Sequence, residues 1–211
     1  YGEALTARLL DAESVLVELD LIPYAPGDRE RIERALKAPW GLIVVTGPTG
    51  SGKTTALYSC LNRLAGPGLK VMSVENPVEY ALPWVEQLPV HSALSFPAAL
   101  RSMLRSDPDV IMIGEIRDAD SLQVAMEATL TGHLVLTTLH TDEAASALIR
   151  MVDIGMDPFV VAEAAKLVVA QRLVRRLCTH CGREGPPAAD LLAKAAALAR
   201  TGGLGWEDLP K

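Results

Sequence analysis

The chain has 211 residues, which is enough for one ordinary domain and a small appendage. Hydrophobic residues make up 49% of it and charged residues 22%, a globular composition that excludes a globally disordered chain. The 20 Lys and Arg residues against 26 Asp and Glu give a net charge of −6, which argues against a protein devoted to neutralising nucleic-acid phosphates.

No apolar run approaches the ~20 residues of a membrane-spanning helix, so we expect neither a direct membrane span nor a signal peptide. The 3 cysteines are too few for a disulfide framework, which favours a reducing cytoplasm. The sequence starts at Tyr1 rather than Met and stops at Lys211 without a closing element. We therefore expect a domain taken from a longer chain.

Apolar runs alternate with helical segments along the chain. We predict buried strands at Leu42–Val45, Lys70–Val74, Val110–Ile113 and Leu134–Leu139. We predict helices at Arg29–Leu36, Thr54–Leu64, Phe96–Arg105, Ser121–Leu130, Ala144–Val152 and Val160–Leu173, and a separate helix at Ala188–Arg200. Because continuously apolar strands alternate with helices, the pattern predicts an α/β fold with helices on both faces of a largely parallel sheet.

The predicted elements divide the chain into three parts. Residues 1–27 are interpreted as the remnant of a preceding domain and a linker, because residues 23–28 are rich in turn formers. Residues 28–177 form the α/β core. Residues 178–211 form a small C-terminal appendage with a Cys-x-x-Cys pair and a helix, and we expect this appendage to be incomplete.

A phosphate-binding loop follows the first predicted strand. The pattern G-x-x-x-x-G-K-[ST] is made by Gly47, Pro48, Thr49, Gly50, Ser51, Gly52, Lys53 and Thr54, with Thr55 next in the helix. Its glycines let backbone N–H groups turn toward phosphate oxygens, and the helix N-terminus adds a positive dipole end. We expect Lys53 to contact the β- and γ-phosphates of ATP and the Thr54 hydroxyl to bind Mg²⁺. The alternative is a turn and helix start with no ligand.

Acidic residues and a histidine follow the other predicted strands. Glu75 and Glu79 come after Lys70–Val74, Glu115 follows Val110–Ile113, and His140 follows Leu134–Leu139. The carboxyl ends of parallel strands share one edge of a sheet, where ligands bind. A nucleoside-triphosphate hydrolase needs an acid for the metal, a base for the water and a polar group near the γ-phosphate. The alternative is that these acids only cap helices and turns.

Four segments resemble the signatures of the motor ATPases of type II secretion and type IV pili. Gly47–Thr54, Val74–Tyr80, Arg105–Asp118 and Thr131–Thr141 are similar to the Walker A, aspartate, Walker B and histidine boxes of that family. The resemblance implies a RecA-like P-loop core that hydrolyses ATP with Mg²⁺ in a homo-hexameric ring. It also implies a cytoplasmic protein attached to the inner membrane through secretion or pilus platform components, with no nucleic-acid partner.

The resemblance also implies roles for individual residues. Glu115 would hold the metal-side water, Glu79 would activate the attacking water, and Glu75 would contribute to the nucleotide site. His140, with His133, would report on the γ-phosphate and the subunit boundary. The aspartate box of the family usually reads Glu-Asp-Pro, whereas this chain has Asn76. Either the two glutamates of this turn suffice, or metal affinity is weakened.

Several arginines are candidates for contacts to the nucleotide. Arg101, Arg105 and Arg117 flank the Walker B strand, and we select Arg117 as a catalytic candidate. Arg8 lies in a segment that looks like the closing strand of the family's preceding domain, a source of arginine fingers that can be worth ~10³–10⁵ in turnover. The alternative for each is a solvated salt bridge.

The cysteines suggest a second, incomplete site. Cys178 and Cys181 form half of a zinc site, since zinc usually takes four ligands and no second pair follows. The alternative is a reduced dithiol; in the family the pair favours the assembly and export members. Cys60 is predicted to lie in the core. Four arginines nearby form either a partner surface or a solvated face: Arg172, Arg175, Arg176 and Arg183.

Two other functions remain open from the sequence. A small-molecule kinase would need an arginine-bearing substrate lid, which we do not find. A nucleic-acid translocase or recombinase is disfavoured by the net charge of −6 and by the 2 Phe, 3 Trp and 4 Tyr, which offer little base-stacking surface. A GTPase is disfavoured because no Asn-Lys-x-Asp sequence is present.

Overall fold

The computed structural model describes residues 18–91, 94–183, 185 and 189–201. The chain divides into two compact units, Tyr1–Leu173 and Val174–Lys211, and the sheet lies in the first. Among the described residues, no helix combines the length and the apolar character that crossing a bilayer requires.

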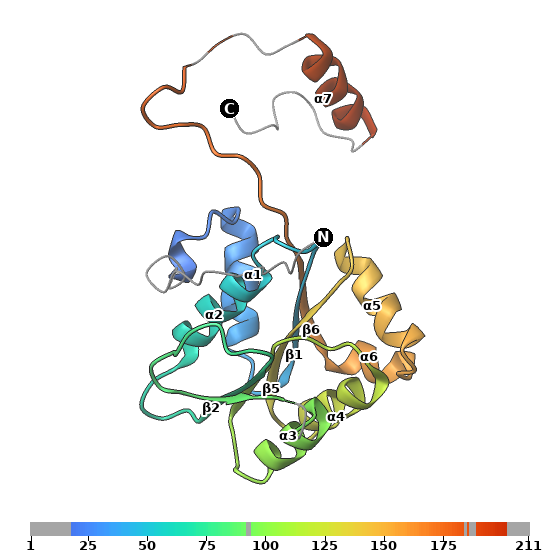
Figure 1. Cartoon of the computed structure of the whole chain (residues 1–211). Helices are drawn as coiled ribbons and strands as arrows, with labels where there is room; N and C mark the ends of the chain where they lie inside the picture. The colour runs from blue at the N-terminus through green and yellow to red at the C-terminus, as the bar shows by residue number, and fades with distance from the viewer. Residues whose placement is uncertain (1–17, 92–93, 184, 186–188, 202–211) are drawn as a thin grey trace, which may run out of the picture. The chain divides into compact units, whose positions relative to one another are not determined.

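The first unit is built on a six-stranded parallel sheet (Figure 1). The strands are β1 (Gly41–Thr46), β2 (Val71–Glu75), β3 (Val85–Pro89), β4 (Val110–Ile113), β5 (Leu134–Leu139) and β6 (Ala165–Ala170). Their order is β3-β2-β4-β5-β1-β6, and every neighbouring pair is parallel. The predicted α/β fold is confirmed, and the four predicted strands are present with ends shifted by at most one residue.

The predicted helix Val160–Leu173 is wrong. The helix α6 (Pro158–Ala164) ends early, and the chain continues as β6, which pairs with β1. Leu167 and Val169 pack on one side of the sheet and Val168 on the other. The Ala, Lys and Leu of this segment favour a helix locally, but the edge of β1 offers main-chain hydrogen bonds that only a strand can use. The short edge strand β3 was not predicted.

Helices cover both faces of the sheet, as predicted (Figure 1). On one face lie the short η1 (Leu19–Leu21), α1 (Pro26–Leu36) and α2 (Lys53–Leu64). On the other lie α3 (Phe96–Leu104), α4 (Ala119–Leu130), α5 (Ala144–Asp153) and α6.

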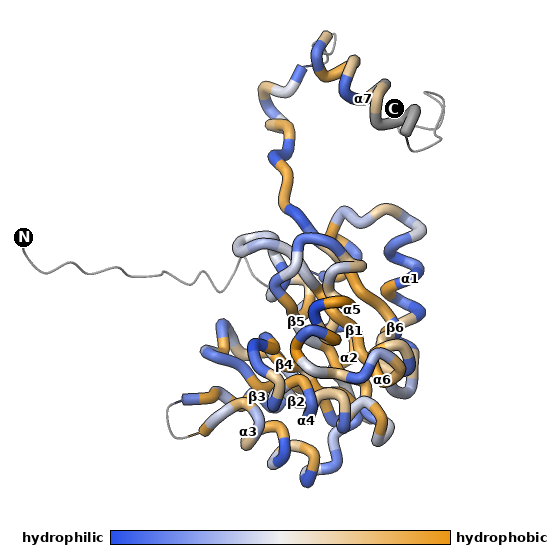
Figure 2. Tube along the Cα trace, turned by 90° about the vertical axis from the view of Figure 1, so that its right-hand side faces the viewer, coloured by the Kyte–Doolittle hydropathy of each residue, from blue (hydrophilic) through white to orange (hydrophobic). Residues whose placement is uncertain are grey.

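The central strands are apolar on both sides because each face is covered. In β1, Leu42 and Val44 enter the core under α4, whereas Ile43 and Val45 enter the core under α2. All four side chains are at most 2% exposed, and burying such a side chain contributes about 1.5–3 kcal/mol. Figure 2 shows this concentration of apolar residues along the strands.

The described part of residues 1–27 packs on the core. Leu19 is buried in the same cluster as α2, and Ile22 and Tyr24 pack against it. The Arg29 guanidinium donates a 2.8 Å hydrogen bond to the Asp20 carbonyl, which fixes this segment on α1. Residues 1–27 were expected to be the remnant of a preceding domain and a linker, and of these, residues 1–17 lie outside the described residues.

The second unit contains one helix, α7 (Ala189–Thr201), within its described residues. Its position agrees with the predicted helix Ala188–Arg200. Before it, the Gly182 N–H donates to the Cys178 carbonyl at 2.8 Å, so residues 178–182 form a turn. Cys178 and Cys181 are both exposed in this turn.

Candidate functional site

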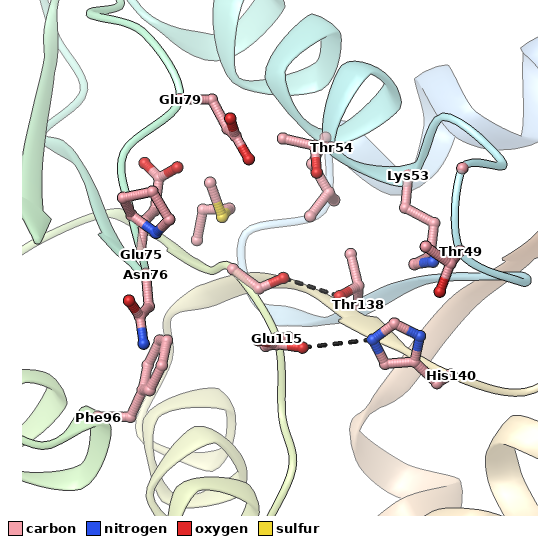
Figure 3. Close-up of a pocket in the computed structure, with 15 residues that line it drawn as sticks. Thr49, Lys53, Thr54, Glu75, Asn76, Glu79, Phe96, Glu115, Thr138 and His140 are labelled. Atoms are coloured by element: carbon pink, nitrogen blue, oxygen red, sulfur yellow. Dashed lines mark hydrogen bonds and ion pairs between the residues drawn. The ribbon is translucent and has the colours of Figure 1, made fainter. Parts of the chain in front are cut away.

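A pocket of about 450 Å³ lies at the carboxyl edge of the sheet (Figure 3). Its walls come from the loop after β1, the start of α2 and the turns that follow β2, β4 and β5. The residues that line it are Thr49, Gly50, Lys53, Thr54, Leu57, Glu75, Asn76, Pro77, Glu79, Phe96, Met112, Gly114, Glu115, Thr138 and His140. Candidates separated by up to 91 positions in the sequence therefore share one cavity.

The loop after β1 wraps closely around its own backbone and requires glycine at two positions. Gly47 has φ 144°, and a Cβ there would lie 2.3 Å from the Gln171 carbonyl oxygen. Gly52 has φ 84°, and a Cβ there would lie 2.8 Å from Gln171 Nε2. Side chains are excluded by both backbone conformation and space. The loop can therefore keep its backbone N–H groups turned inward, as a phosphate cradle needs.

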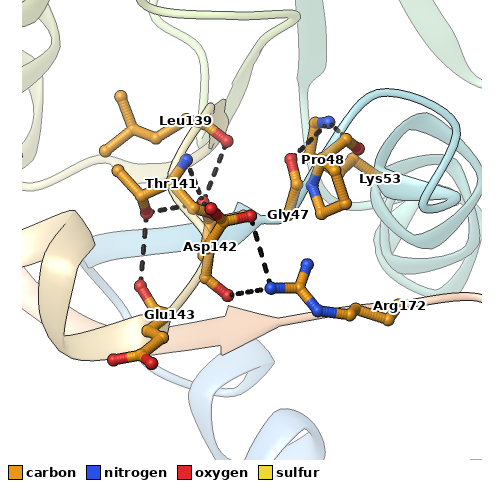
Figure 4. Close-up of polar contacts among 9 residues, drawn as sticks. Gly47, Pro48, Lys53, Leu139, Thr141, Asp142, Glu143 and Arg172 are labelled. Carbon is orange, nitrogen blue, oxygen red and sulfur yellow. Dashed lines mark hydrogen bonds and ion pairs between the residues drawn. The ribbon is translucent and has the colours of Figure 1, made fainter.

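Lys53 is the cation of this cradle. Its Nζ donates to the carbonyl oxygens of Gly47 and Pro48, at 2.9 Å each (Figure 4). Burial lowers the pKa of Lys53, and the nearby Glu115 carboxylate opposes that shift. An ammonium that lines the pocket and, among the described residues, donates to carbonyl oxygens is suited to a stronger, anionic partner.

Ser51 supplies an independent sign that the cradle fits a phosphate. Its Oγ is buried, yet it has no hydrogen-bond partner among the described residues. Buried polar groups are usually satisfied, because leaving one unpaired costs about 1–3 kcal/mol. A phosphate oxygen in this loop would give the hydroxyl an acceptor. The residues present therefore fit a nucleotide phosphate.

Two carboxylates face this cradle from different strands (Figure 3). Glu79 follows β2 and lies on the same side of the pocket as Thr54, an exposed residue at the start of α2. Glu115 follows β4 and has 16% of its side chain exposed. It forms an ion pair with Arg117, and its Oε2 lies 3.3 Å from His140 Nε2.

Glu75 lines the pocket but already has protein partners. Its carboxylate accepts hydrogen bonds from the Tyr58 hydroxyl, from Ser73 Oγ at 2.6 Å and from Gln87 Nε2 at 3.1 Å. The residue is only 3% exposed. The structure therefore gives the Glu75 carboxylate a different environment from those of Glu79 and Glu115, although all three were expected at the nucleotide site.

Gln171, which was not predicted, supports the phosphate loop. At the end of β6 its Nε2 donates to the Ser51 carbonyl at 2.7 Å, and its Oε1 accepts from the Tyr24 hydroxyl at 2.6 Å. Burial raises the pKa of Tyr24 to about 12, as expected for a hydroxyl removed from water. The only sequence signal was a polar residue directly after an apolar run. It was missed because Gln171 fell inside the predicted helix Val160–Leu173.

A second set of contacts joins the loop after β5 to the end of β1 (Figure 4). The buried Thr46 Oγ1 contacts the Leu139 carbonyl at 3.0 Å and the Thr141 carbonyl at 2.7 Å, and it accepts from the Thr141 N–H at 2.9 Å. Arg172 donates to the Asp142 carbonyl at 3.1 Å and to its carboxylate at 3.3 Å. These bonds fix the segment that carries His140 beside the phosphate loop.

Other candidates lie elsewhere. His133 precedes β5, so β5 separates it from His140 by roughly 20 Å, and its Nδ1 contacts the Ala128 carbonyl at 2.8 Å. It does not line the pocket. Arg101 and Arg105 are exposed at the end of α3 and do not line the pocket. Arg8 lies outside the described residues.

The cysteines divide as the sequence suggested. Cys60 is buried in the core under α2, as predicted, and burial raises its pKa to about 12. Within the described ranges, no three His, Cys, Asp or Glu side chains gather as a metal site would require.

The four arginines that the sequence grouped together lie in two units. Arg172 belongs to the first unit and is bound to Asp142, whereas Arg175, Arg176 and Arg183 belong to the second.

Comparison with known proteins identifies the family of the chain. Residues 1–204 match the family model described as type II/IV secretion system protein. The chain is 50% identical over 183 residues to the type II secretion system protein HxcR of Pseudomonas aeruginosa, covering 86% of this chain and 39% of that protein. It is 44% identical over 196 residues to the type IV pilus assembly ATPase PilB of Thermus thermophilus, covering 92% and 22%.

The fold is similar to that of a solved motor protein. The structure of the pilus retraction motor PilT with bound ADP superposes with a TM-score of 0.72 at 32% identity, covering 92% of this chain and 62% of that one. The chain thus spans about two fifths or less of the two curated relatives.

Proposed function

Because the chain belongs to the family of type II/IV secretion system proteins, we propose that it is the ATPase core of a motor for type II protein secretion or type IV pilus assembly. The proposal rests on one observation: Lys53, Glu79 and Glu115 line a single pocket beside a glycine-rich loop. Family membership favours a motor over the kinase and translocase that the sequence alone left open.

The pocket residues would divide the work of ATP hydrolysis. Bound ATP would supply the phosphoanhydride bond, and Mg²⁺ would supply positive charge that offsets the charge developing on the phosphates. The loop 47–52 and Lys53 would hold the phosphates, while Thr54 and Glu115 would face the metal side. Glu79 would orient a water molecule and accept its proton, because its carboxylate lines the same pocket as the phosphate loop. His140, paired with Glu115, would sense the γ-phosphate.

Lys53→Ala tests the nucleotide site directly. We expect MgADP affinity to fall at least tenfold and ATP hydrolysis to be lost, because the phosphate charge loses the Lys53 ammonium as its partner. Isothermal titration with MgADP and a phosphate-release assay would measure both effects. Lys70→Ala is the matched control, since Lys70 lies at the opposite edge and donates to the Ser106 carbonyl. Full ATPase activity in Lys53→Ala would contradict the proposal.

Glu79→Gln separates binding from chemistry. The amide keeps the size of the side chain but cannot accept a proton from water. We expect MgADP affinity within twofold of the original protein and hydrolysis at least a hundredfold slower. A collapse of affinity with normal residual turnover would instead make Glu79 a structural or metal-site residue.

We further propose that the protein works as a homo-hexameric ring on the cytoplasmic side of the inner membrane, bound to platform components there. Arg8, Arg117 and His133 would then serve the boundary between subunits. A turnover rate per subunit that rises with protein concentration would support this, because neighbours would complete each site. Cys178 and Cys181 supply only two ligands, too few for zinc by themselves, so zinc forms no part of the proposal.

A further inference from the structure

We propose that the buried Tyr58 and Glu75 and the partly buried Gln87 form a positioning cluster that holds the turn carrying Glu79 against α2. In this cluster Glu75 is a positioning residue and not a ligand of the nucleotide's metal. The inference rests on the proposed ATPase function, because it assigns the means by which that site places its base.

The two oxygens of Glu75 are committed to protein donors. Oε2 accepts from the Tyr58 hydroxyl, and Oε1 accepts from Ser73 Oγ at 2.6 Å and from Gln87 Nε2 at 3.1 Å. The side chain is buried between β2, β3 and α2. These bonds use three of the roughly four lone-pair sites of the carboxylate, so a metal ion would have to compete with them for the same two oxygens inside the protein.

Side chains of the same cluster form hydrogen bonds with the backbone of the turn between β2 and β3. The Tyr58 hydroxyl accepts a 3.3 Å hydrogen bond from the Glu79 N–H. Gln87 Nε2 donates to the Tyr80 carbonyl at 3.1 Å, and Gln87 Oε1 accepts from the Leu82 N–H at 2.7 Å. These bonds reach three positions of the turn, and Glu79 is one of them.

Aromatic packing adds a fourth contact. The rings of Tyr58 and Tyr80 meet edge to face with centroids 4.5 Å apart. Burial and the Glu75 carboxylate raise the pKa of Tyr58 well above its ordinary value. The hydroxyl therefore keeps its proton, so it can donate to Glu75 while it accepts from the Glu79 N–H.

The position of Tyr58 on α2 explains why the positioning cluster would matter for hydrolysis. Lys53 begins α2, and Tyr58 lies five residues later, about 7.5 Å along the helix axis. One helix therefore carries the phosphate cation, the Thr54 hydroxyl and the anchor of the Glu79 turn. The cluster fixes the distance between the base and the phosphates through a rigid element.

Two variants report on two different amides. Tyr58→Phe keeps the ring but removes the acceptor of the Glu79 N–H, whereas Gln87→Leu removes the acceptor of the Leu82 N–H. In residue-resolved amide exchange of the whole chain, we expect at least tenfold faster exchange at Glu79 in the first variant and at Leu82 in the second. Exchange within α2 should stay unchanged. Cys60→Ala, on the same helix and in the same core, controls for lost packing and should alter neither amide.

Kinetics and metal dependence complete the test. We expect Tyr58→Phe to lower kcat at least fivefold while MgADP affinity stays within twofold. Glu75→Gln should leave the Mg²⁺ concentration for half-maximal activity within twofold. Unchanged exchange at both amides, or a tenfold higher Mg²⁺ requirement in Glu75→Gln, would overturn the inference. Neither outcome contradicts the ATPase proposal. Full ATPase activity in Lys53→Ala would contradict that proposal, independently of the amide exchange rates at Glu79 and Leu82.

Discussion

Replacing Gln171 by Leu should loosen the phosphate loop without opening a cavity. Leu has nearly the same size as Gln, so packing beside Gly52 is kept, but both side-chain hydrogen bonds are lost. The change leaves the Ser51 carbonyl and the Tyr24 hydroxyl without their partner. The backbone bond from the Gln171 N–H to the Thr46 carbonyl remains, so β6 should stay paired with β1.

The expected cost follows from these two lost bonds. An unsatisfied buried polar group costs about 1–3 kcal/mol, and both groups here are only partly buried, so we take about 1–1.5 kcal/mol for each. The free energy of unfolding should therefore fall by about 2–3 kcal/mol. Because the Ser51 backbone belongs to the phosphate cradle, MgADP affinity should fall at least fivefold as well.

Urea unfolding and calorimetric titration with MgADP measure these two quantities. Tyr24→Phe is the matched control, since it removes only the bond from Tyr24 to Gln171 and leaves the bond to Ser51. It should cost about 1 kcal/mol and keep MgADP affinity within twofold. A Gln171→Leu protein within 0.5 kcal/mol of the original, with unchanged affinity, would refute the assigned role.

Three further predictions concern stability and thiol chemistry. Thr46→Val should lower the free energy of unfolding by about 2–3 kcal/mol in urea titration, because the partly buried N–H and carbonyl of Thr141 both lose their bond to the Thr46 hydroxyl; a change below 0.5 kcal/mol would contradict this. Iodoacetamide at pH 7.5 should label Cys178 well before Cys60, because hydrogen bonds from the His180 and Cys181 backbone lower the pKa of the exposed Cys178 thiol, whereas burial raises that of Cys60; equal rates by mass spectrometry would count against it. Between pH 9 and 10 the free energy of unfolding should lose about 1 kcal/mol through Cys60, because the thiol ionises near pH 9 when unfolded and only near pH 12 when folded. Stability from this raised pKa is thus complete below pH 9 and lost at higher pH, and Cys60→Ala should show a slope smaller by that amount.

The sequence predicted which residues line the pocket better than it predicted how their side chains contact one another. Lys53, Glu79, Glu115 and His140 were found because each follows a buried strand, and strand ends of a parallel sheet meet at one edge. His133 was grouped with them by its motif alone. It precedes β5, and a strand of six residues carries the two ends of that motif to opposite edges of the sheet.

The hydrogen-bond partners of a side chain could not be predicted from the sequence in the same way. Glu75 and Glu79 are four positions apart and both line the pocket, and nothing local says which carboxylate accepts hydrogen bonds from buried protein groups. The answer depends on Tyr58 and Gln87, whose elements come together only in the folded sheet. The same holds for Gln171, which contacts Ser51 across 120 positions of sequence.

By itself, the sequence determined the parallel sheet, the phosphate loop and the order of the motifs. Strands buried on both faces are continuously apolar, and loop positions with positive φ take glycine, so both features can be recognised from residue type. The tertiary structure alone decided that Ala165–Ala170 is a strand and that Val85–Pro89 extends the sheet. Both segments lie at sheet edges, where their residues are only partly buried and their local preferences are weak. Pairing with β1 and β2 supplies hydrogen bonds that no neighbouring residue could offer, so these strands exist only because a partner strand is already there.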